Sequence, residues 1–122
     1  MGKRTVIIGA SPNPNRYAFR AAELLTAHDH EIVPVGIKKG TVFGKEILDV
    51  RTSPEVSNVD TVTLYVGPAN QEGLLKYIRQ LKPRRVIFNP GTENPELQAQ
   101  LENLGIEPLE ACTLVMLRTG QY

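Results

Sequence analysis

The chain has 122 residues, of which 41% are hydrophobic and 22% are charged, and its formal net charge at pH 7 is +1. This composition is typical of a globular domain and excludes a disordered or fibrous chain. The near-neutral charge supplies no overall field for nucleic acid, and no apolar run approaches the roughly 20 residues that cross a bilayer. We therefore expect a single cytoplasmic domain over residues 1–122 that binds neither nucleic acid nor a membrane.

The beginning of the chain predicts a strand, a loop and a helix. Thr5–Ile8 is short and rich in β-branched residues, as in a buried strand, and Arg16–Ala27 has apolar residues at helical spacing. A helix that starts above the end of a strand points its free N–H groups and the positive end of its dipole there, so we expect an anion at this loop. The loop is not the dinucleotide fingerprint G-x-G-x-x-G, because Ser11 stands in place of the second glycine.

The second strand is predicted at Glu31–Val35, where Pro34 favours a strand end, an edge or a bulge. A basic loop follows it, and a weak apolar stretch around Val42 and Ile47 predicts irregular structure or short strands. Nicotinamide dinucleotide sites usually carry an acidic residue at the end of this strand, whereas this loop carries Lys38 and its neighbour Lys39. The two lysines suit a phosphate on the ribose, as in NADP or coenzyme A, and the alternative is that both are solvated surface residues.

The rest of the chain alternates strands with helices. The predicted strands are Asp60–Val66, Arg85–Phe88 and Ile106–Leu109, and the predicted helices run from about Gln71 to Leu81 and from Pro95 to Leu104. We expect Asn70 to cap the first of these helices and Gly105 to end the second. The apolar segment Ala111–Leu117 is ambiguous between helix and strand.

This order of elements predicts an α/β fold with a doubly wound, mostly parallel sheet of about five strands between two layers of helices. Ligands of such sheets bind beyond the carboxyl ends of the strands. The loops at those ends are rich in glycine, proline and asparagine, which permit close approach of a ligand. They are Gly9–Arg16, Gly36–Lys39, Gly67–Asn70 and Asn89–Glu93.

Several of these segments carry a family resemblance. They are Gly9-Ala10-Ser11-Pro12 with Arg16-Tyr17 downstream, Val33-Pro34-Val35, and the aspartate that opens the third strand. With them the chain resembles the small stand-alone CoA-binding proteins, which are similar to the Rossmann-like CoA-binding domain of the succinyl-CoA synthetase alpha subunit. The resemblance runs from Val6 to about Cys112. The chain departs from the family pattern at Gly36-Ile37, where asparagine and proline are usual, and at Ile87-Phe88-Asn89.

The resemblance implies a set of site residues. Gly9, Ala10, Ser11, Pro12 and Arg16 would contact the diphosphate, Val35 and Lys38 would border the adenosine, and Tyr65, Gly67, Pro68, Pro90 and Gly91 would line the path of the nucleotide or the pantetheine arm. The residue types point the same way, because main-chain N–H groups and an arginine suit phosphates, and apolar loop residues suit adenine and pantetheine. Tyr65 can alternatively be an ordinary core aromatic.

The sequence favours a binding protein over an enzyme. The synthetase subunit needs a phosphorylatable histidine in a second domain, whereas His28 and His30 lie at a helix-to-strand connection on the opposite side of the sheet. Ser11 has no histidine to activate it, and Cys112 has the apolar neighbours of a buried, inert thiol. We therefore assign no catalytic residue and no metal site. The expected function is non-catalytic binding of coenzyme A or an acyl-CoA, and the alternative is a small NADP-type or other nucleotide-dependent oxidoreductase. A protein partner or a homo-oligomer stays open.

Overall fold

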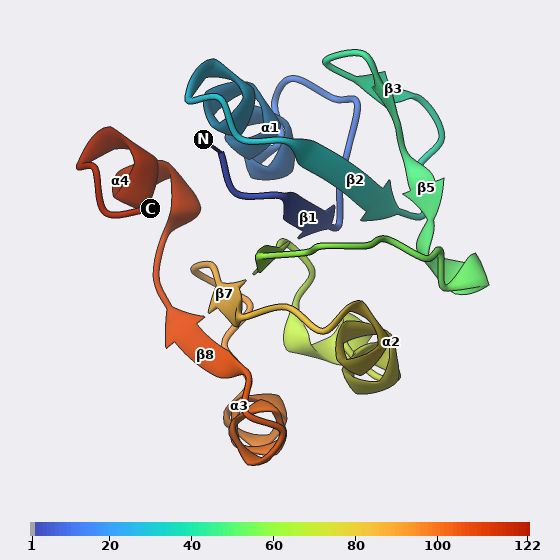
Figure 1. The fold of residues 1–122 in the computed structure, drawn as a ribbon. Coiled ribbons are helices and arrows are strands. Elements are labelled where there is room, and N and C mark those ends of the chain that lie inside the picture. Colours follow the sequence, from blue (N-terminus) through green and yellow to red (C-terminus); the bar gives the residue numbers. More distant parts are fainter. Residues whose placement is uncertain (1) are drawn as a thin grey trace.

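The computed structural model describes residues 2–122 (Figure 1). Six parallel strands form one sheet in the order β5-β2-β1-β6-β7-β8. They are β1 (Thr5–Ile8), β2 (Ile32–Gly36), β5 (Leu48–Asp49), β6 (Thr61–Leu64), β7 (Arg85–Phe88) and β8 (Glu107–Glu110). The expected parallel α/β sheet is confirmed, with one strand more than predicted, because Leu48 pairs with Val35 at the edge of the sheet. A small antiparallel hairpin of β3 (Thr41–Val42) and β4 (Lys45–Glu46) precedes β5.

The strand order reverses at the centre of the sheet. The chain runs outward from β1 through β2 to β5, returns to β6 on the other side of β1, and then runs outward to β8. Ile8, the last residue of β1, pairs with Val35 of β2 on one side and with Leu64 of β6 on the other. The loops that follow β1, β2 and β6 therefore emerge side by side, at the position where such sheets bind their ligands.

Helices cover both faces of the sheet. α1 (Tyr17–Ala27) and α4 (Thr113–Arg118) lie on one face, and α2 (Leu74–Leu81) and α3 (Pro95–Asn103) lie on the other (Figure 1). The central strands β1 and β6 are buried throughout, as expected of parallel strands covered on both faces. One core includes Ile7, Ala18, Ala22, Leu25 and Leu117, and the other includes Val6, Ile8, Leu64, Ile78 and Leu101.

The connection from β6 to α2 differs from the prediction. Asn70 does not cap a helix. It ends a short 3-10 turn, η2 (Pro68–Asn70), and α2 begins at Leu74 after Gly73, whose φ is +84°. The cause lies in Gln71, which is buried and bonded to neighbouring loops, so the chain needs three more residues before it can turn into the helix. A second 3-10 turn, η1 (Val50–Thr52), follows β5.

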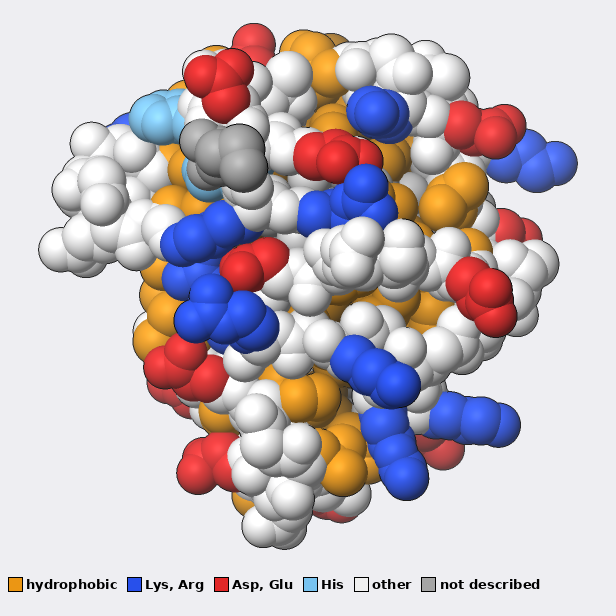
Figure 2. Space-filling view, viewed as in Figure 1, with side chains coloured by type: hydrophobic (Ala, Val, Ile, Leu, Met, Phe, Trp, Pro, Cys, Tyr) orange, Lys and Arg blue, Asp and Glu red, His pale blue; other side chains and the backbone are white. Residues whose placement is uncertain are grey.

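The carboxyl-terminal segment is helical from Thr113, which resolves the ambiguity of Ala111–Leu117. α4 packs against α1, so the chain crosses from the edge strand β8 back over the sheet. Acidic and basic side chains are interspersed over the face seen in Figure 2, in keeping with the net charge of +1. None of the helices in the described part of the chain has the length and apolarity needed to cross a membrane.

Candidate functional site

Two glycines let the loops at the carboxyl edge pack against one another. Gly9 has a φ of +96°, and a Cβ atom at this position would lie 3.0 Å from the main-chain carbon and oxygen of Tyr65. Both the backbone conformation and the close contact require glycine. A Cβ atom at Gly36 would lie 3.1 Å from the main-chain oxygen of Ala10. The ends of β1, β2 and β6 are therefore in direct contact.

The first loop is held by hydrogen bonds to β2 and by one within the loop. The N–H groups of Gly9 and Ala10 both donate to the carbonyl oxygen of Val35, at 2.9 and 3.1 Å. Ser11 is only 8% exposed, and its Oγ accepts a hydrogen bond from the N–H of Asn13 at 3.1 Å. Gly9, Ala10 and Ser11 thus shape the loop, and the N–H groups of Gly9 and Ala10 are engaged by the neighbouring strand.

The start of α1 offers free donors. No side chain among the described residues caps this helix, and its first turn holds no acidic residue. Within residues 2–122, no hydrogen bond uses the main-chain N–H of Ser11, Tyr17 or Ala18. Arg16, at the N-cap position, is exposed. Free N–H groups and the positive end of a helix dipole are features that stabilise anions in proteins, and Arg16 adds a cation at the same turn.

The loop after β2 lies against the first loop. A Cβ atom at Gly40 would lie 3.2 Å from the Pro12 side chain, and the rings of Phe43 and Phe19 pack with their centroids 4.9 Å apart. The β3–β4 hairpin is thereby attached to α1. Lys38 and its neighbour Lys39 are exposed between these contacts and form no ion pair with any residue of the described chain.

Val35 and Tyr65 point away from the loops. The Val35 side chain is fully buried, so only its main chain reaches the carboxyl edge. The half-buried Tyr65 ring packs into the core beneath α1, and its hydroxyl group has no hydrogen-bond partner among residues 2–122. Burial raises the pKa of this hydroxyl well above its ordinary value. Tyr65 therefore meets the loops with its main chain, which lies against Gly9.

A buried glutamine connects the remaining two loops. Gln71 is 4% exposed, and its Nε2 donates to the carbonyl oxygens of Val66, at 2.9 Å, and Thr92, at 2.7 Å. Its Oε1 accepts a hydrogen bond from Nδ2 of Asn94 at 2.9 Å. From the sequence Gln71 is predicted only as the start of a helix, because nothing in its spacing indicates burial.

The rim of these loops is open. Pro68, Pro90 and Gly91 are exposed, and a Cβ atom at Gly67 would lie 3.8 Å from the carbonyl oxygen of Gly91. The four residues predicted to line this part of the site therefore lie on two adjacent loops. Beneath them Asn89, which is 2% exposed, accepts from the N–H of Thr113 at 2.9 Å and joins β7 to α4.

The histidines lie at the opposite edge of the sheet, after the end of α1. Nδ1 of His30 accepts a hydrogen bond from the N–H of Lys3 at 2.9 Å. Burial, then the positive charge of Lys3, lowers the pKa of His30. Among residues 2–122 no three His, Cys, Asp or Glu side chains are placed to share a metal ion. Cys112 is half-buried at the N-cap of α4, with a free thiol.

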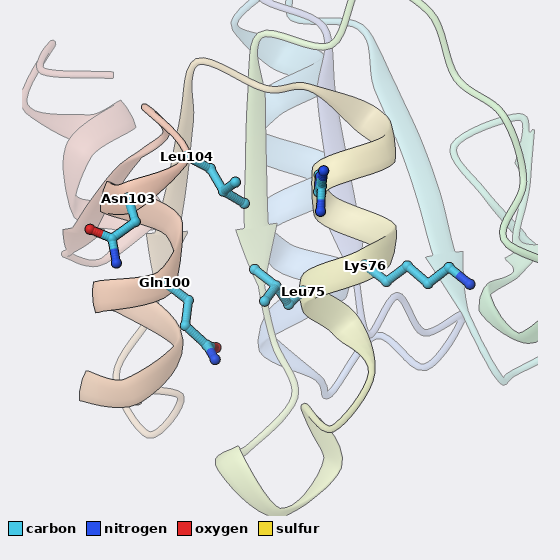
Figure 3. Close-up of a pocket in the computed structure, with 6 residues that line it drawn as sticks. Leu75, Lys76, Gln100, Asn103 and Leu104 are labelled. Atoms are coloured by element: carbon cyan, nitrogen blue, oxygen red, sulfur yellow. The ribbon is translucent and has the colours of Figure 1, made fainter.

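A groove of about 330 Å³ lies between α2 and α3 (Figure 3). It is lined by Leu75, Lys76, Arg79, Gln100, Asn103 and Leu104. None of these residues belongs to the four loops at the carboxyl edge, so the groove is separate from the candidate site.

Comparison with models of known protein families identifies the family of this chain. The sequence model of a family described as "CoA binding domain" matches residues 3–118. Among curated proteins no match is found. The crystal structure of an uncharacterized protein is 56% identical in sequence, with 100% of this chain and 99% of that chain covered and a TM-score of 0.95.

More distant structures share the fold. A hypothetical protein from Pyrococcus horikoshii OT3 is 23% identical, with 97% of this chain and 83% of that chain covered and a TM-score of 0.83. A protein named RSP, solved in complex with beta-NADH, is 15% identical, with 99% of this chain and 59% of that chain covered and a TM-score of 0.62. At these identities the likeness extends to the fold alone.

Proposed function

Because this chain belongs to the CoA-binding domain family, we propose that it binds coenzyme A or an acyl-CoA, as a single unit, at the carboxyl edge of its sheet and without catalysing a reaction. Family membership indicates a nucleotide- or CoA-binding role in general. The placement of the ligand on this chain is our proposal, and it rests on the loops described above.

The uncapped start of α1 carries the proposal. The diphosphate would lie on the Gly9–Arg16 loop, with the free N–H groups of Ser11, Tyr17 and Ala18 as donors. Arg16 would add a charge-assisted hydrogen bond from its guanidinium. Gly9, Ala10 and Pro12 would contribute shape, since two of their N–H groups already bond to β2.

The adenosine would lie over the end of β2. Lys38 stands exposed in the loop that follows Val35, where it can meet a phosphate on the ribose. Ile37 precedes it and leaves 64% of its surface exposed, which offers an apolar contact for adenine. This arrangement supports a ribose phosphate, which coenzyme A carries and dephospho-CoA lacks.

The pantetheine arm would run over the ends of β6 and β7. Gly67 and Pro68 form one side of this path, and Pro90 and Gly91 form the other. Tyr65 would contribute through its main chain, because its ring lies in the core. The arm is mostly apolar and uncharged, and these four residues bring no charge to the path.

Calorimetric titration of the purified protein with CoA, dephospho-CoA and NADP tests the proposal. We expect CoA to bind more tightly than dephospho-CoA, because only CoA carries the 3′-phosphate that Lys38 would meet. Tighter binding of NADP would instead favour an oxidoreductase-type site. Equal affinities for CoA and dephospho-CoA would show that Lys38 does not contact the 3′-phosphate. If none of the three ligands binds, the proposed function is refuted.

A further inference from the structure

Gln71 uses its whole amide group to join two loops. Both N–H groups of its side chain are engaged by main-chain oxygens, of Val66 after β6 and of Thr92 after β7, and its oxygen accepts from Asn94. A glutamine side chain has two N–H donors, so no donor is left for other contacts. Val66 and Thr92 follow different strands, and Gln71 fixes the separation between them.

The partners of Gln71 are themselves held in place. Thr92 is 4% exposed, and its Oγ1 donates to the carbonyl oxygen of Asn89 at 2.8 Å. Oδ1 of Asn94 accepts from the N–H of Leu97 at 3.2 Å and thereby caps α3. The amide of Gln71 therefore connects the end of β6 to the end of β7 and to the start of α3.

The bonds of Gln71 serve the loops and not the apolar core. Burial of an amide is costly unless the amide is fully hydrogen-bonded, and an apolar side chain here would leave the carbonyl oxygens of Val66 and Thr92 without this partner. All three partners of Gln71 lie at the carboxyl edge. The inward turn of Gln71 also delays the start of α2 to Leu74. The bonds of Gln71 hold the Gly67–Pro68 loop at a defined distance from the Pro90–Gly91 loop.

We infer that Gln71 is a positioning residue that sets the width of the path for the pantetheine arm and so the affinity for CoA. This inference rests on the proposed function, in which those two loops line the arm. The adenosine and its phosphates would lie on the loops after β1 and β2, to which Gln71 makes no hydrogen bond. Loss of the Gln71 amide should therefore weaken binding of the arm and leave binding of the nucleotide part unchanged.

The experiment compares two ligands on one variant. Gln71→Met keeps the length of the side chain and removes its hydrogen bonds. We expect the Kd for CoA to rise about tenfold, because the loops lose their preorganisation, and the Kd for adenosine 3′,5′-bisphosphate to change less than about twofold. Gln80→Met is the matched control, since Gln80 is an exposed glutamine of α2 that bonds to Ser53 away from the site. It should change neither Kd.

A second variant and a second measurement distinguish a local change in the two loops from misfolding of the whole domain. Gln71→Glu keeps the size of the side chain but places a carboxylate oxygen against the carbonyl oxygens of Val66 and Thr92, so it should also weaken CoA selectively. Amide hydrogen exchange without ligand should quicken in residues 66–70 and 91–94 of either variant and stay unchanged in β1 and β6.

The outcomes separate the two proposals. Wild-type protein that binds neither CoA nor the bisphosphate refutes the proposed function together with this inference. If the wild type binds both ligands, equal losses of affinity for both in the Gln71 variants, or no loss for either, would overturn only the role of Gln71. Selective loss for CoA supports both proposals.

Discussion

The two edges of the sheet differ in how the cations nearest its central strands are partnered. At the amino edge, Arg4 pairs with Glu31 at 3.1 Å and Arg84 pairs with Asp60 at 3.3 Å. At the carboxyl edge, Arg16 has no acidic partner within ion-pair distance among residues 2–122, and neither does Lys38 or its neighbour Lys39. Exposed pairs contribute little to stability, so their value here lies in cancelling charge. Arg51 does pair with Asp49 at the end of β5, so the cations of the described chain without an acidic partner at this edge lie in the loops after β1 and β2, where an anionic ligand is proposed to bind.

The amino edge is also closed by Tyr122. Its ring packs on the His30 ring with the centroids 4.8 Å apart, and the guanidinium of Arg85 lies 4.5 Å from the ring centre. Its hydroxyl shares a hydrogen bond with Oγ1 of Thr5, and its main-chain oxygen accepts from Lys3 and from Arg85. The side chains around Tyr122 contact one another, whereas within residues 2–122 the start of α1 leaves main-chain N–H donors free. Variants at the two edges should accordingly separate stability from binding.

The largest effect is expected at the carboxyl edge from Gly9→Ala. The free energy of unfolding should fall by about 2 to 5 kcal/mol, because a positive φ costs roughly 1 to 2 kcal/mol and the close contact with Tyr65 adds roughly 1 to 3 kcal/mol. Urea unfolding measures this loss. Gly44→Ala is the control, since Gly44 has a φ of +80° but nothing within 4 Å of the added Cβ. If both variants lose the same stability, the contact with Tyr65 contributes nothing.

Arg16→Ala should change binding and leave stability almost unchanged. We expect CoA affinity to fall by about 1.5 to 3 kcal/mol if the guanidinium holds the diphosphate, and the free energy of unfolding to change by less than about 0.5 kcal/mol. Calorimetric titration and urea unfolding measure the two effects. Arg84→Ala, at the amino edge, should leave CoA affinity unchanged. An unchanged affinity in Arg16→Ala would show that Arg16 only faces water.

Tyr122→Ala should have the reverse effect. The free energy of unfolding should fall by about 2 kcal/mol, roughly half the cost of removing a fully buried aromatic ring, because Tyr122 is half-buried. CoA affinity should not change. Tyr122→Phe keeps the ring and loses only the bond to Thr5, so its loss of stability should be smaller. A marked loss of CoA affinity in Tyr122→Ala would mean that the two edges are coupled.

The smallest effect is expected from the titration of His30. Its pKa is lowered by burial first and then by the charges of Lys3, His28 and Arg85, against the opposing effect of Asp29. A lowered pKa in the folded state means that the stability tied to neutral His30 is present above its ordinary pKa and is lost as the pH falls through the lowered value. Protonation also removes the acceptor for the Lys3 N–H.

Urea unfolding between pH 7 and pH 5 should therefore show a small loss of stability that is reduced in His30→Gln. His28→Gln should retain most of this loss, because it removes only one of the smaller causes that lower the pKa of His30 and leaves burial and the Lys3 charge in place. A pH profile of His30→Gln identical to that of the wild type would assign the loss to other groups.

Much of the fold is predictable because it depends on local signals in the sequence. These are the spacing of apolar residues and the glycines and prolines that end helices and strands. Thr5–Ile8 is recognisable as a buried strand from its β-branched run, and Gly105 ends the helix that precedes β8. β5 and the start of α2 were not predictable in the same way. Leu48 becomes part of a strand only because Val35 lies beside it, and Gln71 leaves the helix only because its bonding partners come from other loops.

The candidate site also has parts that the sequence predicts and parts that depend on contacts between distant segments. Its loops follow from the topology, since parallel strands end at one edge and the order reverses between β1 and β6. The free N–H donors at the start of α1 are predictable from the order of strand, loop and helix. The bonds from Gly9 and Ala10 to Val35 are not, because they depend on how two strands pack. The assignment of individual residues to parts of CoA stays a prediction until binding is measured.

The contact between Phe19 and Phe43 has a kinetic consequence. It attaches the β3–β4 hairpin to α1, and Gly40 beside Pro12 completes the connection between the loops that follow β1 and β2. A ligand arriving there would meet a surface that is already ordered, so little conformational entropy would be lost on association. Substitutions of the uncharged residues of these loops should then leave the association rate nearly constant and shorten the residence time of the complex.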